Sequence, residues 1–366
     1  MARCDPPRSM TKAVPHRFHN RPVETLPRKD LDRLRLHLLR RTLRHAYEGS
    51  AHYKAAFKDA RFDPAKVRSI DDISKIPLLT RFEVSFSQSS WPPFGDLLCV
   101  NGAQLSTTVM TSGNVGRPIL VPLTENDSTY YCAPDSELWY RAIHPFGRKK
   151  DDIILSTWSH AVDAWSASSL ALSRRRRGMP IVISGGATVE QELAILARLR
   201  PTILLTSPTV CSEMRKRVSE LRTEERERIR VRAIIIGGAL GRKDLVPWDL
   251  QGHDVEMLEV AYAAEVGLIG HECQVHDGLH VPEDHLLVEV LDRDGSPVAP
   301  GEEGELVVTT LRHEAMPLIR YRLGDITATI PGQCPCGRTH MRLKGLLGKV
   351  TPSMVQADVP GPNGPA

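Results

Sequence analysis

The spacing of apolar residues changes along the chain, and each change predicts a different kind of structure. Between Leu31 and Tyr47, leucines recur at helical spacing with Arg and His on the opposite face, which predicts an amphipathic helix. From Val100 onward, short apolar runs alternate with helix-length segments such as Val189–Arg200. The runs are Ile153–Ser156, Ile181–Ser184, Ile203–Thr206 and Ala233–Ile236. Strands that alternate with helices predict parallel pairing and an α/β layer.

The pattern changes again after about residue 284. Leu286–Leu291 and Glu305–Leu311 flank a segment that contains an Asp-Gly pair at Gly295, which predicts a β-hairpin in a small antiparallel subdomain. We therefore expect one large domain over residues 25–350, with its β-subdomain at about 284–348. Residues 1–24, rich in Arg, His and Pro, predict a disordered basic leader, and residues 351–366 a flexible tail.

Composition narrows the class of protein. The chain has 366 residues with 41% apolar and 25% charged side chains, an ordinary globular balance. We find neither an apolar run of about 20 residues nor a signal-peptide pattern, and a net charge of +4 gives little support for nucleic-acid binding. Seven scattered cysteines do not form a secreted disulfide framework. These features predict a cytoplasmic protein with reduced thiols that binds neither membrane nor nucleic acid.

Three short motifs carry candidate chemistry. In Thr111–Pro118, two glycines three residues apart allow a tight turn whose N–H groups and hydroxyls could bind phosphate. Glu265, just after the run Val255–Val260, could hold Mg²⁺, and Asp325 could accept hydrogen bonds from a ribose diol. Taken singly, a loop of this kind is more often an ordinary turn, a lone glutamate is usually a surface residue, and Gly-Asp is a common turn pair.

The order and spacing of the motifs resemble the signatures of the acyl-adenylate-forming ligases, in particular the phenylacetate–CoA ligase branch. The motifs, in chain order, are Thr111–Pro118, Gly237–Ala239, Tyr262–Glu265, Tyr321–Asp325 and Cys334–His340. The resemblance is densest in Asp284–Leu291 and Gly301–Gly337. It implies a large N-terminal adenylating-type α/β domain. It also implies that ATP and an aromatic or similar carboxylic acid give acyl-AMP, whose acyl group passes to a thiol or an unusual nucleophile such as an amine.

The resemblance also implies roles for individual residues. The phosphate loop comprises Thr111, Ser112, Gly113, Gly116 and Arg117. Glu265 would bind Mg²⁺ and Asp325 the ribose, and we take Glu265 and Arg117 as the catalytic pair. The adenine and acid pocket would be flanked by Gly237, Gly238, Ala239 and Tyr262. Trp158, His160 and Trp165 would line the acid pocket, with core packing as the alternative.

Several positions depart from the family pattern. Asn114 and Val115 replace two hydroxyl residues, and Ala263 and Ala264 precede the glutamate where the family has Gly and Thr or Ser. The sequence ends soon after Gly348, near the family's hinge, so we expect no C-terminal lid domain and no lid lysine. The alternatives to an autonomous enzyme are a non-catalytic scaffold and a subunit that receives a lid or carrier protein from a partner.

A set of cysteines and a histidine predicts a metal site. Cys273 and His280 form one pair, and Cys334 and Cys336 form a second. A Cys₃His set suits tetrahedral Zn²⁺ in a closed structural site, which the resemblance also implies. His271 and His276 are competing imidazoles, and the alternative is three unrelated thiols and a surface histidine.

Overall fold

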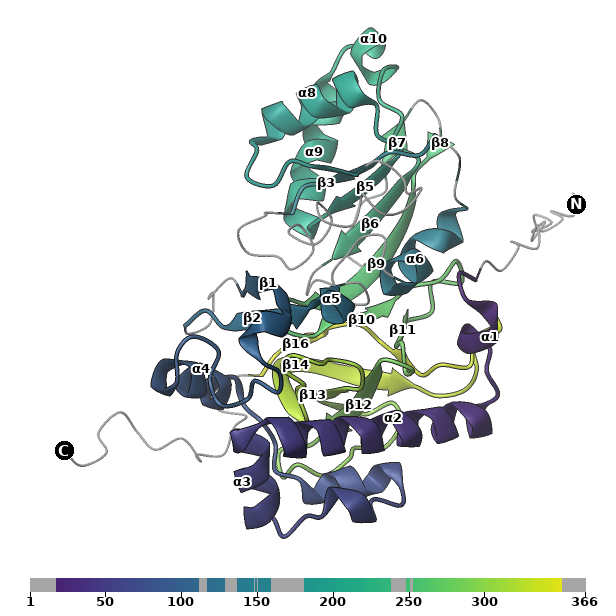
Figure 1. Ribbon diagram of the computed structural model, residues 1–366. Coiled ribbons are helices and arrows are strands. Elements are labelled where there is room, and N and C mark those ends of the chain that lie inside the picture. The colour runs from purple at the N-terminus through teal and green to yellow at the C-terminus, as the bar shows by residue number, and fades with distance from the viewer. Residues whose placement is uncertain are drawn as a thin grey trace, which may run out of the picture.

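One long mixed β-sheet runs through the molecule (Figure 1). The computed structural model describes residues 18–111, 117–128, 137–147, 149, 151–158, 181–237, 248–250 and 253–350. Within this part, twelve strands form the sheet, in the order β12-β13-β14-β15-β11-β10-β9-β6-β5-β3-β4, with β16 paired to β14. The half from β9 to β4 is parallel and the half from β10 to β12 is antiparallel.

The parallel half confirms the predicted α/β layer. Its strands are β3 (Ile154–Ser156), β4 (Ile181–Ile183), β5 (Ile203–Thr206), β6 (Ala233–Gly237) and β9 (Glu256–Ala263). Helices α8 (Val189–Leu199) and α9 (Pro208–Glu220) cover one face of this half, and α6 (Glu137–Ile143) lies on the other (Figure 1). Both faces are therefore buried, which explains the continuous apolar runs in the sequence.

The antiparallel half contains the predicted hairpin. Its strands are β10 (Gly267–His271), β11 (Leu279–His280), β12 (Leu286–Leu291), β13 (Glu303–Thr310), β14 (Tyr321–Ile330), β15 (Arg342–Leu343) and β16 (Gly348–Lys349). Strands β12 and β13 pair from Leu286↔Thr310 to Leu291↔Glu305. The Asp-Gly pair does not join the strands directly: the connection spans 292–302, and Gly295 adopts a positive φ of 77° in its first turn.

A layer of N-terminal helices lies against the antiparallel half (Figure 1). The elements are α1 (Arg21–Glu24), α2 (Arg28–Gly49), α3 (Ala51–Asp59), the 3-10 turns η1 (Pro64–Lys66) and η2 (Ile70–Lys75), and α4 (Arg81–Ser90). Helix α2 is the predicted amphipathic helix, and its leucines enter the main core. The sequence placed α1 in a disordered leader, but Glu24 is buried and accepts a hydrogen bond from Arg338 Nε at 2.7 Å, so residues 18–24 are part of the folded body.

The remaining elements complete the described chain. A separate two-stranded hairpin, β1 (Leu105–Met110) with β2 (Leu120–Thr124), lies beside α4 and leads into α5 (Glu125–Asp127). Short elements are η3 (Gly102–Gln104), η5 (His144–Phe146), α10 (Thr223–Arg226), β7 (Asp249–Leu250) and β8 (His253–Asp254). In the described residues, each helix is too short or too polar to cross a bilayer.

Candidate active site and metal centre

The loop at residues 112–118 has both of its ends fixed in the fold. Thr111 is buried; its N–H donates to the Ile119 carbonyl at 3.0 Å, and the Ile119 N–H donates to Thr111 Oγ1 at 2.9 Å. Ser112, Gly113 and Gly116 lie outside the described residues. Arg117 is exposed, and its Nη1 donates to Ser89 Oγ at 3.3 Å.

Glu265 lies in the turn between β9 and β10, with most of its surface buried. Its Oε1 accepts hydrogen bonds from Arg81 Nη1 at 3.2 Å and from the Tyr321 hydroxyl at 2.9 Å. The second terminal nitrogen of Arg81 donates to Thr111 Oγ1 at 2.7 Å. A single guanidinium therefore joins the start of the candidate phosphate loop to the candidate metal-binding carboxylate.

Burial of the Tyr321 hydroxyl, followed by its contact with the Glu265 carboxylate, raises the pKa of Tyr321 well above its ordinary value. The phenol therefore remains a hydrogen-bond donor to Glu265 throughout the neutral pH range. Neither Arg81 nor the role of Tyr321 was predicted from the sequence. The capping box of Thr80 with Glu83 could have located the start of α4, but not the direction of the Arg81 side chain.

Asp325 lies on β14, the strand that begins with Tyr321. It pairs in register with Lys349 of β16, whose ammonium lies 2.7 Å from Asp325 Oδ1. Burial raises the pKa of the Asp325 carboxyl, and Lys349 opposes that shift. Just before it, Gly324 adopts a positive φ of 71°, within an irregular stretch of the β13–β14 pairing that bends the strand locally.

Aromatic side chains gather where the parallel strands end. Trp158 follows β3 and stacks on Tyr262 near the end of β9, with ring centroids 6.1 Å apart. Gly237, the last residue of β6, lies against the Trp158 ring: a Cβ at this position would be 2.5 Å from Trp158 Cζ2. These residues lie at the carboxyl ends of parallel strands, where α/β sheets bind ligands. Gly238, Ala239, His160 and Trp165 lie outside the described residues.

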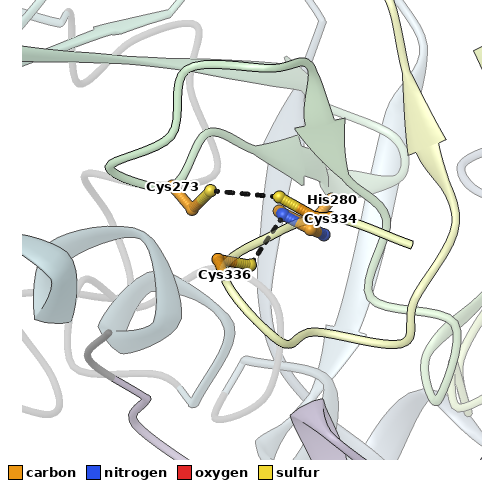
Figure 2. Close-up of side chains that lie close together, drawn as sticks. All are labelled: Cys273, His280, Cys334 and Cys336. Carbon is orange, nitrogen blue, oxygen red and sulfur yellow. Dashed lines mark hydrogen bonds between the residues drawn. The ribbon is translucent and has the colours of Figure 1, made fainter. Parts of the chain in front are cut away.

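The four predicted metal ligands come together in one buried cluster (Figure 2). Cys273 follows β10, His280 ends β11, and Cys334 and Cys336 lie between β14 and β15. Their ligand atoms all lie within 4.8 Å of one another. The Cys273 and Cys334 sulfurs are 3.8 Å apart, and Cys336 Sγ is 3.4 Å from His280 Nε2.

These distances suit a tetrahedral zinc ion. Zinc bonds of about 2.3 Å to sulfur and about 2.0–2.1 Å to nitrogen place two sulfurs about 3.8 Å apart, and a sulfur and a nitrogen about 3.6 Å apart. Backbone N–H groups of Val275 and Arg338 also point at the Cys273 and Cys336 sulfurs, each at 3.4 Å. Such contacts stabilise thiolate ligands.

The competing imidazoles lie outside the cluster. His271 Nδ1 is 3.0 Å from the Glu272 carbonyl, and His276 Nδ1 lies 3.5 Å from the Glu272 carboxylate. A tight turn joins Cys334 to Gly337, because the Gly337 N–H donates to the Cys334 carbonyl at 3.0 Å and Gly337 has a φ of 90°. Among the histidines considered, His280 is thus the one that joins the three cysteines.

No model of a known protein family matches the chain. It is 28% identical over 342 residues to a phenylacetate-coenzyme A ligase from Thermus thermophilus, which covers 91% of this chain and 73% of the relative. It is 26% identical over 328 residues to the phenylacetate-coenzyme A ligase of Escherichia coli, covering 88% of this chain and 73% of that protein. Among solved structures, 2-hydroxyisobutyryl-CoA ligase with a bound 2-HIB-AMP aligns with a TM-score of 0.79 at 23% identity, over 90% of this chain and 70% of that one.

Proposed function

This chain is a homologue of the phenylacetate-coenzyme A ligases, and we propose that it is an ATP-dependent, AMP-forming ligase that activates an aromatic or similar carboxylic acid. The single observation that carries this proposal is the junction of Thr111 and Glu265 through one arginine. That junction lies beyond the carboxyl end of β9, where a ligand of an α/β sheet would bind.

The reaction needs no protein nucleophile. A carboxylate oxygen of the acid attacks the α-phosphorus of ATP, the bond from that phosphorus to the bridging oxygen breaks, and pyrophosphate leaves. A thiol such as that of CoA, or an amine, then attacks the acyl carbon and AMP leaves. The protein contributes positioning and neutralisation of charge, for which a fixed set of hydrogen-bond donors and a divalent cation suffice.

We assign the nucleotide to the residues that the sequence singled out. Glu265 would hold Mg²⁺ and Asp325 would accept the ribose hydroxyls, while the loop that starts at Thr111 and ends at Arg117 would bind the phosphates. Gly237, the two residues after it and Tyr262 would flank the adenine and the acid. The stacked pair of Trp158 and Tyr262 offers a flat aromatic wall, which suits a planar acid.

We also infer that the Cys₃His cluster holds a structural Zn²⁺ ion. All four ligands are buried, and a closed four-ligand site leaves no coordination position for substrate. The ion would join the β10–β11 connection to the segment between β14 and β15. Glu265 lies just before β10, the strand that leads to Cys273. The ion would therefore hold the antiparallel half close to the nucleotide site.

Two measurements test the proposed activity. We expect the protein to bind ATP only with Mg²⁺ in calorimetric titration, and to exchange labelled pyrophosphate into ATP when the correct acid is present. A panel of phenylacetate, substituted benzoates and short 2-hydroxy acids covers the substrate class. A folded protein that binds no MgATP would contradict the proposal and favour a non-catalytic scaffold.

A further inference from the structure

We propose that Arg81 is the side chain that binds the β- and γ-phosphates of ATP, in the position that the sequence assigned to Arg117. This inference rests on the proposed function, because it supposes that the site takes ATP. It adds a residue from α4, an element outside every motif identified in the sequence. The argument depends on where the two guanidinium groups lie.

The Arg81 guanidinium lies at both ends of the candidate phosphate loop. One terminal nitrogen donates to Thr111 Oγ1 at 2.7 Å, and the same nitrogen lies 3.4 Å from the Arg117 carbonyl. The other terminal nitrogen donates to Glu265 Oε1 at 3.2 Å. A phosphate chain that runs from Thr111 to a metal ion held by Glu265 would therefore pass beside this guanidinium, whose planar donors match phosphate oxygens.

Arg117 is directed elsewhere. It is exposed, and its Nη1 donates to the Ser89 hydroxyl in the last turn of α4. The first and last turns of α4 thus face different surroundings: Arg81 faces Glu265, and Ser89 faces Arg117. Of these two arginines, Arg81 is the one in contact with the residues assigned to phosphate and metal.

A metal ion on Glu265 would release Arg81 for this role. The Arg81 guanidinium donates to a Glu265 carboxylate oxygen. A divalent cation on that oxygen would repel a second positive charge at the same distance. The guanidinium would then turn toward the phosphate oxygens that arrive with the metal, and its side chain is about a quarter exposed, which leaves room for such a turn.

Helix α4 keeps its place without Arg81. Gln88 exchanges two hydrogen bonds with the Leu120 backbone, at 2.6 and 2.9 Å, and Val84 is buried in the main core. The capping box of Thr80 and Glu83 closes the helix N-terminus independently of the arginine. Substitution of Arg81 should therefore change ligand binding far more than it changes folding.

The test compares ATP with AMP, both in the presence of Mg²⁺, by calorimetric titration of the full chain. We expect Arg81→Gln to weaken ATP binding by about 10- to 100-fold, the usual effect of losing a charge-assisted hydrogen bond. AMP lacks the β- and γ-phosphates, so its affinity should change by less than about threefold. Arg81→Lys keeps the charge and should recover part of the ATP affinity.

Arg217→Gln is the matched control. Arg217 lies on α9 and makes surface ion pairs with Glu190 of α8 and Glu220 of α9. It should bind both nucleotides like the unmodified protein, and the unfolding temperature of each variant without nucleotide checks its fold. Unchanged ATP affinity in Arg81→Gln, or an equal loss for ATP and AMP, would overturn the inference alone. Absence of MgATP binding by the unmodified protein would overturn the proposed function as well.

Discussion

Loss of the proposed zinc site should lower the stability of the whole antiparallel half. The perturbation is the double substitution Cys334→Ser and Cys336→Ser, which removes both ligands contributed by the segment between β14 and β15. The remaining pair, Cys273 and His280, cannot cross-link the two segments alone. We expect the bound zinc to fall from one ion per chain to nearly none.

The expected magnitude follows from the length of chain that the ion closes. Cys273 and Cys334 are 61 residues apart in sequence. A cross-link that closes a loop of this length reduces the entropy of the unfolded chain, which raises the free energy of the unfolded state by about 4 kcal/mol. Urea unfolding should therefore show a free energy of unfolding about 4 kcal/mol lower in the double variant than in the unmodified protein.

The assay combines metal analysis by mass spectrometry with urea unfolding followed by circular dichroism. Cys99→Ser is the matched control, because Cys99 is a free, partly buried cysteine outside the cluster. It should keep its zinc and most of its stability. A protein without bound metal after expression in zinc-containing medium, or a double variant within about 0.5 kcal/mol of the unmodified protein, would refute the reasoning.

Three further substitutions test other parts of the structure. Glu265→Gln should weaken MgATP binding by at least about tenfold in calorimetric titration, because a neutral amide is a poor Mg²⁺ ligand; affinity within twofold of the unmodified protein would contradict this role. Gly237→Ala should displace the Trp158 ring, since the new Cβ would lie 2.5 Å from Cζ2, and should shift tryptophan fluorescence and lower stability by about 1–3 kcal/mol. Glu283→Gln should lower the free energy of urea unfolding by about 3 kcal/mol, because it breaks the buried ion pair with Arg35 and the half-exposed one with Arg28. Burial raises the pKa of Glu283, but hydrogen bonds and charges from the neighbouring arginines lower it by a larger amount. The pKa of Glu283 in the folded protein is therefore below its ordinary value of 4.5. Its contribution is present above pH 4.5 and is lost as the pH falls through the lowered pKa, so an acid titration of stability should be flatter in Glu283→Gln.

Local signals in the sequence were enough to predict much of the fold. Ile203–Thr206 and Ala233–Ile236 were predicted as strands because they are short apolar runs between helix-length segments, and β5 and β6 confirm them. The β12–β13 hairpin was predicted from two apolar runs around a turn signal. The predicted runs leave residues 292–304 between the two strands, and the structure has 292–302, because a turn at Gly295 does not fix where the second strand begins.

The candidate site depended on contacts that no local pattern contains. Arg81 contacts Glu265 across 184 residues of sequence, and an arginine in the first turn of a helix is ordinarily a surface residue. The cluster of three cysteines and a histidine was predicted because each pair is close in sequence and has a chemistry of its own. Residue 24 was placed in a disordered leader because its partner, Arg338, is 314 residues away.

The most direct test of the activation chemistry follows an oxygen atom. The protein is incubated with MgATP, hydroxylamine as a small nucleophile, and the active acid labelled with ¹⁸O in both carboxylate oxygens. Attack of the carboxylate on the α-phosphorus transfers one labelled oxygen to the nucleotide, so mass spectrometry should find AMP with one ¹⁸O. Release of ADP and phosphate, or of AMP without the label, would contradict an acyl-adenylate intermediate.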